Sequence, residues 1–108
     1  MEASQRAGAD PAGIALLLAG PAAKELWSGP PIRVGAPRRT GTGFMVDLAV
    51  GEASTGRLHI TAAGTGRSAA DLRLVLCAPA DEALAIADAG HAFLDRLVAA
   101  AQARSSAA

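Results

Sequence analysis

Three segments between residues 44 and 76 alternate apolar and polar side chains, and this alternation constrains the fold more than any other feature of the sequence. A period of two places every second residue on one face of a β-strand. The residues that share a face are Phe44, Val46, Leu48 and Val50, then Leu58, Ile60 and Ala62, then Leu72, Leu74 and Leu76. Because the connections are short, we predict a three-stranded antiparallel meander with one apolar face.

The next segment, residues 80–104, has the apolar spacing of an α-helix. Its apolar stripe consists of Ala83, Ile86, Gly90, Phe93, Leu97 and Ala101, and Leu84, Leu94 and Val98 widen it. Acidic residues lie in the first turn and arginines towards the end, which favours the helix dipole. A small sheet needs a cover, so we predict that this long amphipathic helix packs on the meander. Gly90 would allow the helix to approach a strand closely.

The segment before the strands begins without any apolar period. Residues 1–9 are interpreted as a flexible N-terminus. Asp10 followed by Pro11 is a helix-start signal in which the carboxylate can cap the first turn. We therefore predict a helical segment over residues 10–27, interrupted at Gly20 and Pro21 because proline cannot continue the helix.

Residues 28–43 are rich in proline and glycine and are interpreted as a linker or a long loop. Alternation around Arg33 leaves room for a short edge strand at residues 32–34. At the other end of the chain, residues 105–108 are interpreted as a frayed tail. The meander and its helix, residues 44–104, form the ordered domain in this interpretation.

The fold class that follows is α+β, with an N-terminal helix, the meander and the C-terminal helix in two layers. Hydrophobic residues make up 51% of the chain, but 28 of them are alanine, which leaves 26 larger apolar side chains for a core. That number suits one thin domain and hardly two. A core this small is a reason to expect a partner.

Charge and composition exclude several classes of function. Ten basic and ten acidic side chains cancel, and only three residues are aromatic, so we expect no nucleic-acid partner. The densest apolar run, residues 14–19, is too short to cross a bilayer, so we expect no membrane insertion. A single cysteine, Cys77, fits a reducing compartment, and we expect a cytoplasmic protein.

The arginines are concentrated in the loop over residues 28–43. Arg33, Arg38 and Arg39 lie there and could dock an acidic partner, although a solvated loop explains them more simply. His91, which follows Gly90 on the predicted helix, completes the candidate partner-binding set. Two Gly-Thr-Gly triplets, at residues 41–43 and 64–66, lack the rest of a phosphate-binding motif and are interpreted as turns.

Only two histidines and one cysteine could ligate a soft metal or act as nucleophiles. His59, Cys77 and His91 show no paired ligand spacing and no nucleophile signature, so we predict no catalytic, metal or cofactor-binding residue. The alternative is a small enzyme or ligand-binding protein with a pocket between sheet and helix near these three side chains. Whether the protein is an enzyme stays open at this point, and no cofactor is expected.

The second half of the chain resembles the C-terminal domain of the type III secretion needle-length and substrate-switch proteins, relatives of the flagellar hook-length control protein. The likeness lies in GRLHITAAG, in the alternating leucines that run into Cys77 and Ala78, and in the helix with Ile86, His91, Leu94 and Val98. It implies a bacterial switch-like domain that contacts the export gate. Family members usually have a long length-sensing region before this domain and often a strand after the helix, and these 108 residues show neither.

We therefore expect a non-catalytic protein-interaction module, with a component of the secretion export gate as its partner if the resemblance holds. A third hypothesis is a subunit of a homo- or hetero-oligomer that completes its sheet through an edge strand. In that hypothesis the outer segments of the meander, residues 44–50 and 71–76, are the sheet edges.

Overall fold

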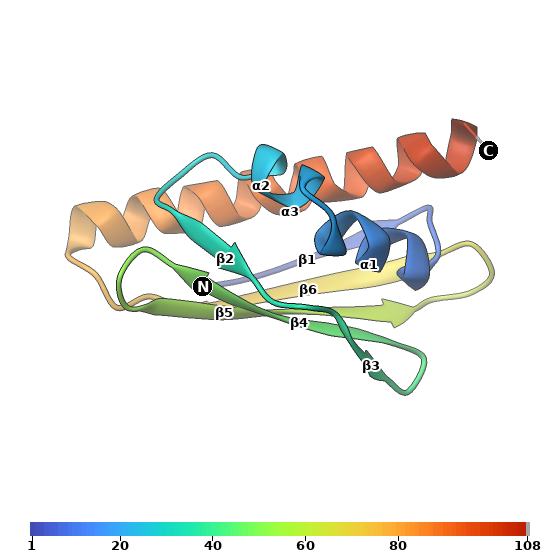
Figure 1. Ribbon diagram of the computed structural model, residues 1–108, viewed down its shortest axis with the longest axis horizontal. Helices are drawn as coiled ribbons and strands as arrows, with labels where there is room; N and C mark the ends of the chain where they lie inside the picture. Colours follow the sequence, from blue (N-terminus) through green and yellow to red (C-terminus); the bar gives the residue numbers. More distant parts are fainter. Residues whose placement is uncertain (108) are drawn as a thin grey trace.

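The computed structural model describes the secondary structure of residues 1–107 and the side-chain environments of residues 1–104. The chain folds into two layers (Figure 1). A twisted sheet forms one layer, and the helices lie across one of its faces. The elements in chain order are β1 (Glu2–Ala7), α1 (Pro11–Ala19), α2 (Ala22–Leu26), β2 (Ile32–Val34), β3 (Arg38–Thr40), β4 (Gly43–Val50), β5 (Ser54–Ala62), β6 (Ser68–Val75) and α3 (Ala80–Ala107).

The sheet is antiparallel throughout and has the order β1-β6-β5-β4-β2, with β3 also paired to β4. The α+β class, the central meander and the long helix packed on it are confirmed. The predicted strand number is wrong, because the meander β4-β5-β6 is only the middle of a sheet of six strands. None of the helices in the described part of the chain is long and apolar enough to cross a membrane.

The core lies between the sheet and the helices. α3 packs over β1 and β6, while α1 packs over β4 and β5. Trp27, which follows α2, meets Phe93 of α3 edge to face, with ring centroids 5.7 Å apart. The largest fully buried side chains include Phe93, Ile14, Leu58, Ile60, Leu72, Ile86, Leu94, Leu97, Val46 and Val50. The predicted inward faces are confirmed except that Phe44, Leu76 and Ala83 are half-buried and that Ala62 and Leu84 are exposed.

The prediction of a flexible N-terminus is wrong, because residues 2–7 form strand β1. The amino group of Met1 donates to the carbonyl oxygen of Leu74 at 3.0 Å, and the Leu74 amide donates back to the Met1 carbonyl oxygen at 2.8 Å. The ladder continues to Ala7, opposite Ser68. The ordering comes from a partner strand more than 60 residues away, which local sequence does not reveal.

The proline-rich segment also contributes to the sheet. β2 lies where the short edge strand was predicted, at residues 32–34. β3 was not predicted, and the two short strands pair with different halves of β4. Between them, the Gly35 amide donates to the Asp47 carbonyl oxygen at 2.8 Å, which keeps the chain beside β4. Residues 28–43 are therefore a broken edge strand as well as a loop.

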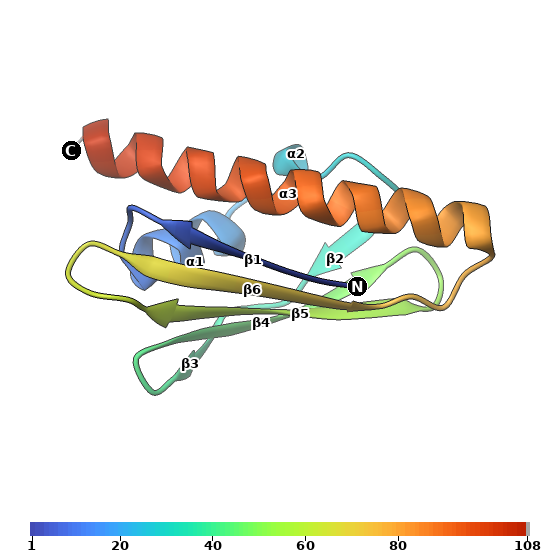
Figure 2. The ribbon, with the colours of Figure 1, turned by 180° about the vertical axis from the view of Figure 1, so that it is seen from behind.

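These additions move the edges of the sheet. The prediction that residues 44–50 and 71–76 lie at the edges is wrong, because β2 and β3 cover β4, and β1 covers β6. One true edge, β1, runs beside α3 (Figure 2). The other is short, interrupted and flanked by Pro30, Pro31 and Pro37. Both features disfavour pairing with another sheet.

The helices follow the sequence signals closely. α1 and α2 lie within the predicted helical segment and are separated at Gly20 and Pro21. Asp10 precedes α1, but its carboxylate does not cap the helix and instead accepts a hydrogen bond from the Gly66 amide at 3.1 Å. The predicted tail is wrong for residues 105–107, which continue α3, while residue 108 lies outside the described residues.

Close approach of α3 to the sheet occurs at Gly90, as predicted. A Cβ at this position would lie 2.9 Å from Leu74 Cδ1 and 3.1 Å from Met1 Cε. The glycine therefore lets the long helix settle onto β6 and the start of the chain. This contact holds the helix over one half of the sheet. No helix among the described residues lies on the opposite face of the sheet.

Candidate functional site: the open face of the sheet

The face of the sheet that points away from the helices is here called the open face. Alternation along each strand assigns its members, since most of the residues between them are buried or half-buried on the helix side. They are Glu2, Ser4 and Arg6 on β1, Arg33 on β2, Arg38 and Thr40 on β3, Met45, Asp47 and Ala49 on β4, Thr55, Arg57, His59 and Thr61 on β5, and Ala69, Asp71, Arg73 and Val75 on β6.

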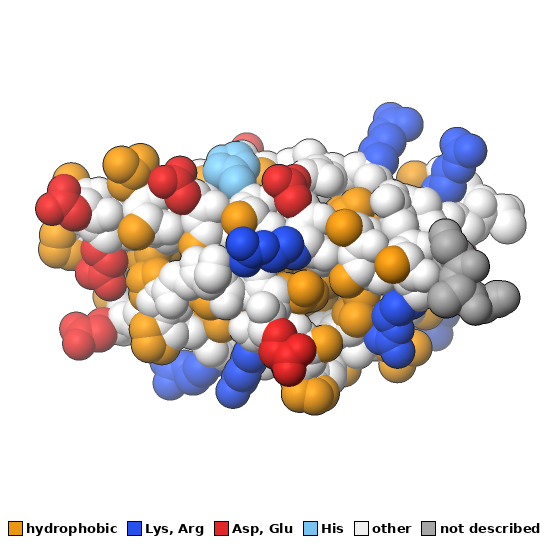
Figure 3. All heavy atoms as spheres, turned by 90° about the horizontal axis from the view of Figure 1, so that it is seen from above, with side chains coloured by type: hydrophobic (Ala, Val, Ile, Leu, Met, Phe, Trp, Pro, Cys, Tyr) orange, Lys and Arg blue, Asp and Glu red, His pale blue; other side chains and the backbone are white. Residues whose placement is uncertain are grey.

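The open face carries more positive than negative charge, although the whole chain is neutral. Five arginines accompany three carboxylates on it, which gives a formal surplus of two positive charges. The helices have the reverse balance, with three basic side chains and five carboxylates. Figure 3 views the helix side, where the acidic side chains gather over the start of α3 and basic ones over its other end. The sequence therefore separates its charges between two layers.

Two arginines face each other at the centre of the open face. Arg57 and Arg73 are direct cross-strand neighbours on β5 and β6, an arrangement that is unfavourable for like charges. Each arginine forms an ion pair with a carboxylate on the strand that lies on its far side from the other arginine. Arg73 Nε lies 3.5 Å from Glu2 Oε1, and Arg57 Nε lies 3.2 Å from Asp47 Oδ1.

Asp47 is shared between two arginines, because Arg38 Nη2 also lies 3.1 Å from its carboxylate. The row across the sheet therefore consists of Asp47, Arg57, Arg73 and Glu2. Arg38, which lies opposite Met45 in the next outward row, adds a third guanidinium group beside these two carboxylates. All of these side chains are more than half exposed, so each ion pair contributes only about 0–1 kcal/mol. Such pairs can exchange for a new anionic partner at little cost to the fold.

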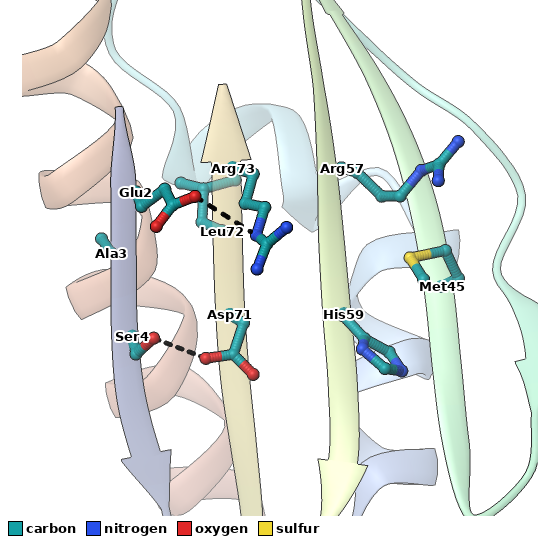
Figure 4. Close-up of a pocket in the computed structure, with 9 residues that line it drawn as sticks. All are labelled: Glu2, Ala3, Ser4, Met45, Arg57, His59, Asp71, Leu72 and Arg73. Carbon is teal, nitrogen blue, oxygen red and sulfur yellow. Dashed lines mark hydrogen bonds and ion pairs between the residues drawn. The ribbon is translucent and has the colours of Figure 1, made fainter. Parts of the chain in front are cut away.

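Two shallow hollows flank the arginine pair. The first, of about 300 Å³, is lined by both arginines and by Glu2, Ala3, Ser4, Met45, His59, Asp71 and Leu72 (Figure 4). Figure 4 shows Arg57 leaning towards β4 and Arg73 tied to Glu2. The second, of about 480 Å³, lies on the other side of the pair, lined by Asp47, Leu48, Thr55, Gly56 and Val75.

The first hollow is bounded by a polar row. The Ser4 hydroxyl donates to the Asp71 carboxylate, and Asp71 lies directly opposite His59 on the neighbouring strand. His59 Nε2 lies 3.5 Å from Thr40 Oγ1, which ties the row to β3. In the second hollow, by contrast, Val75 is 62% exposed and Gly56 has no side chain, so that side is more apolar.

The structure distributes the predicted partner-binding residues over different surfaces. Arg38 belongs to the central charge network of the open face, and Arg33 lies on the same face near its edge. Arg39 is exposed but points to the other side of β3 from Arg38. His91 is exposed on α3, in the layer that covers the opposite face of the sheet. These four residues do not form one site.

The alternative pocket of His59, Cys77 and His91 is not formed. His59 lies on the open face, whereas His91 lies on the helix layer. Cys77 is exposed after β6, and its amide donates to the Ser54 hydroxyl at 3.0 Å. Among the described residues, no group of three or more His, Cys, Asp or Glu side chains is placed to hold a metal ion. The space between sheet and helix is occupied by core side chains.

The second Gly-Thr-Gly triplet forms the turn between β5 and β6, as predicted. Gly64 and Gly66 both have positive φ, and the Gly66 amide is already bonded to the Asp10 carboxylate. The anion held by this turn is therefore a side chain of the protein itself, which fastens the turn to the start of α1.

The central arginines were not singled out from the sequence. Alternation alone predicts that Arg57, Arg73 and Asp47 face outward, and this is confirmed. Their alignment in one row depends on strand register, and β1, which brings Glu2, is absent from the predicted meander. The signal that could have found them is a pair of arginines on consecutive outward strand faces.

Comparisons of the chain with protein-family models, curated proteins and solved structures found no match. The evidence for the candidate site is therefore the geometry of this chain.

Proposed function

We propose that the protein is a non-catalytic protein-interaction module that binds its partner on the open face of the sheet. The observation that carries this proposal is the central arginine pair, which has fewer carboxylates than positive charges around it and a hollow on each side. Directional strand faces make a rigid platform, and rigid platforms lower the entropic cost of docking.

The biological setting that we propose is control of substrate specificity in bacterial type III secretion, with an export-gate component as the partner and the cytoplasm as the location. Support comes from the resemblance over β5, β6 and α3, where the alternating leucines lead into the amphipathic helix. The small alanine-rich core adds to this, since a thin two-layer domain gains stability from a bound partner.

The test is capture of a purified cytoplasmic domain of the export gate by the purified full chain. We expect a complex at micromolar concentrations that Thr55→Trp abolishes, because the bulky ring would stand over the open face beside Val75. The matched control is Leu84→Trp, which places the same ring on the exposed side of α3 and should leave capture unchanged. Absence of a complex, or equal effects of the two variants, would refute the proposal.

A further inference from the structure

We propose that the open face binds an extended acidic segment of a protein partner, with a carboxylate between Arg57 and Arg73 and an apolar side chain two residues away in the hollow beside Val75. This inference rests on the proposed function, because it takes the open face as the docking surface. It adds the chemistry of the partner and the pattern of its sequence.

The charge balance at the centre of the face favours an incoming carboxylate. Arg57 shares Asp47 with Arg38, while Arg73 has only the longer contact to Glu2 at 3.5 Å. Three guanidinium groups therefore accompany two carboxylates, with Arg57 and Arg73 in the same row as the carboxylates and Arg38 in the next row. A third carboxylate placed between the facing arginines would relieve their repulsion and accept charge-assisted hydrogen bonds from both.

The spacing of residues along a strand predicts the sequence pattern of the bound segment. Val75 and Thr55 form the outward-facing row next to Arg73 and Arg57, because Val75 follows Arg73 by two residues on β6 and Thr55 precedes Arg57 by two residues on β5. Two residues of extended chain span about 6.6–6.8 Å, in a strand of the sheet and in a bound segment alike. A segment aligned with the strands therefore places two side chains, two residues apart, over both rows. An acidic residue and an apolar residue separated by one other residue, in either chain direction, match the arginines and the hollow.

Asp71, on the other side of the arginine row from Val75, limits how many acidic side chains the partner segment can place on the face. Asp71 lies two residues from Arg73 on the other side, at the edge of the first hollow. Its carboxylate would repel a second acidic group placed two residues before the first. The face therefore selects one acidic side chain with an apolar side chain two residues away, and does not act as a general anion surface.

A nucleic acid is the competing anionic occupant, and the face is poorly built for it. Its carboxylates at Glu2, Asp47 and Asp71 would meet neighbouring phosphates, and none of its outward residues is Phe, Tyr or Trp, the large rings on which successive bases stack. Val75, at the arginine pair, also offers an apolar surface that a phosphate backbone would not use.

The experiment measures the fluorescence anisotropy of a short labelled peptide as the full chain is titrated into it. In the peptide a single Ser separates each Glu from the next Val, so that the acidic and apolar side chains stand two residues apart. We expect saturable binding that falls at least about tenfold when Glu is replaced by Gln in the peptide, because the charge-assisted bonds are lost. The double variant Arg57→Gln/Arg73→Gln should show the same loss, and Val75→Thr should weaken binding about threefold.

The matched control is Arg33→Gln, which removes one charge from the open face without touching the central pair and should change affinity less than about twofold. Thermal unfolding of each variant shows whether the fold is retained. The inference is overturned if the peptide fails to bind, if Arg33→Gln weakens binding as much as the double variant, or if a single-stranded oligonucleotide of equal charge binds as tightly as the peptide.

Capture of the export-gate domain separates this inference from the function on which it rests. If the double arginine variant still captures that domain as well as the unaltered chain does, the proposed function stands and the acidic-segment inference fails. If the peptide binds as expected but the gate domain is not captured, the acidic-segment inference stands and the secretion role fails.

Discussion

The covered face and the open face are built from alternate residues of the same strands, yet their side chains serve different ends. On the covered face, Leu58, Ile60 and Leu72 are fully buried against the helices. On the open face, their neighbours Arg57 and His59 make polar contacts in water. The alternation of period two therefore separates a face that stabilises the fold from a polar face, which is the binding surface in the function proposed above.

Removing equal side chains from the buried and exposed sides of α3 sharpens this comparison most. Leu94→Ala should lower the free energy of unfolding by about 2–5 kcal/mol, because Leu94 is 1% exposed and its loss leaves a cavity in the core. Leu84→Ala, at a position 66% exposed, should change it by less than about 0.5 kcal/mol. Urea unfolding of both variants measures the difference, and equal losses would contradict the assignment of the core.

A smaller effect is expected from two serines on opposite faces of the sheet. Ser68 is fully buried and its hydroxyl donates to the Ala9 carbonyl oxygen at 2.8 Å, so Ser68→Ala should cost about 1–2 kcal/mol by leaving that oxygen without its partner. Ser4→Ala removes an exposed bond to Asp71 and should cost less than about 0.5 kcal/mol. Thermal and urea unfolding distinguish the two. A larger loss at Ser4 would break the comparison between the faces.

The smallest stability effect should come from the carboxylate at the centre of the open face. Asp47→Asn releases Arg38 and Arg57 from their ion pairs and should change the free energy of unfolding by less than about 1 kcal/mol. It should nevertheless tighten binding of the acidic peptide about threefold, because two guanidinium groups lose their competing partner. Asp88→Asn makes the same charge change on α3 and serves as the control. Equal affinities for the two variants would show that only net charge matters.

The sequence predicts best those elements whose partners are close along the chain. The meander β4-β5-β6 and α3 repeat their apolar residues with a clear period, and their neighbours follow directly. β1 escapes prediction because its inward positions hold Ala3, Gln5 and Ala7, which bury little area, and because its ordering depends on β6. β3 escapes because Arg38, Arg39 and Thr40 resemble a polar loop until β4 is beside them.

For the candidate site, the sequence predicts which face each side chain lies on but not which side chains lie beside it on the neighbouring strands. Alternation assigns Arg57 and Arg73 to the outward faces of two strands. The register that sets them opposite each other depends on the length and conformation of the turn at residues 63–67, where Gly64 and Gly66 adopt positive φ. The same register fixes His59 opposite Asp71, and the fold then places His91 in the other layer.

The pairing of the first strand with the last has a consequence for biosynthesis. β4, β5 and β6 are joined by short turns and can pair during synthesis. β1 cannot pair until β6 has been synthesised, about 60 residues later. At about 5–20 residues per second, that wait lasts roughly 3–12 s. During this interval the nascent chain exposes an unpaired strand, so the closing of β1 onto β6 is expected to be the late step of folding and the stage at which a ribosome-associated chaperone would matter most.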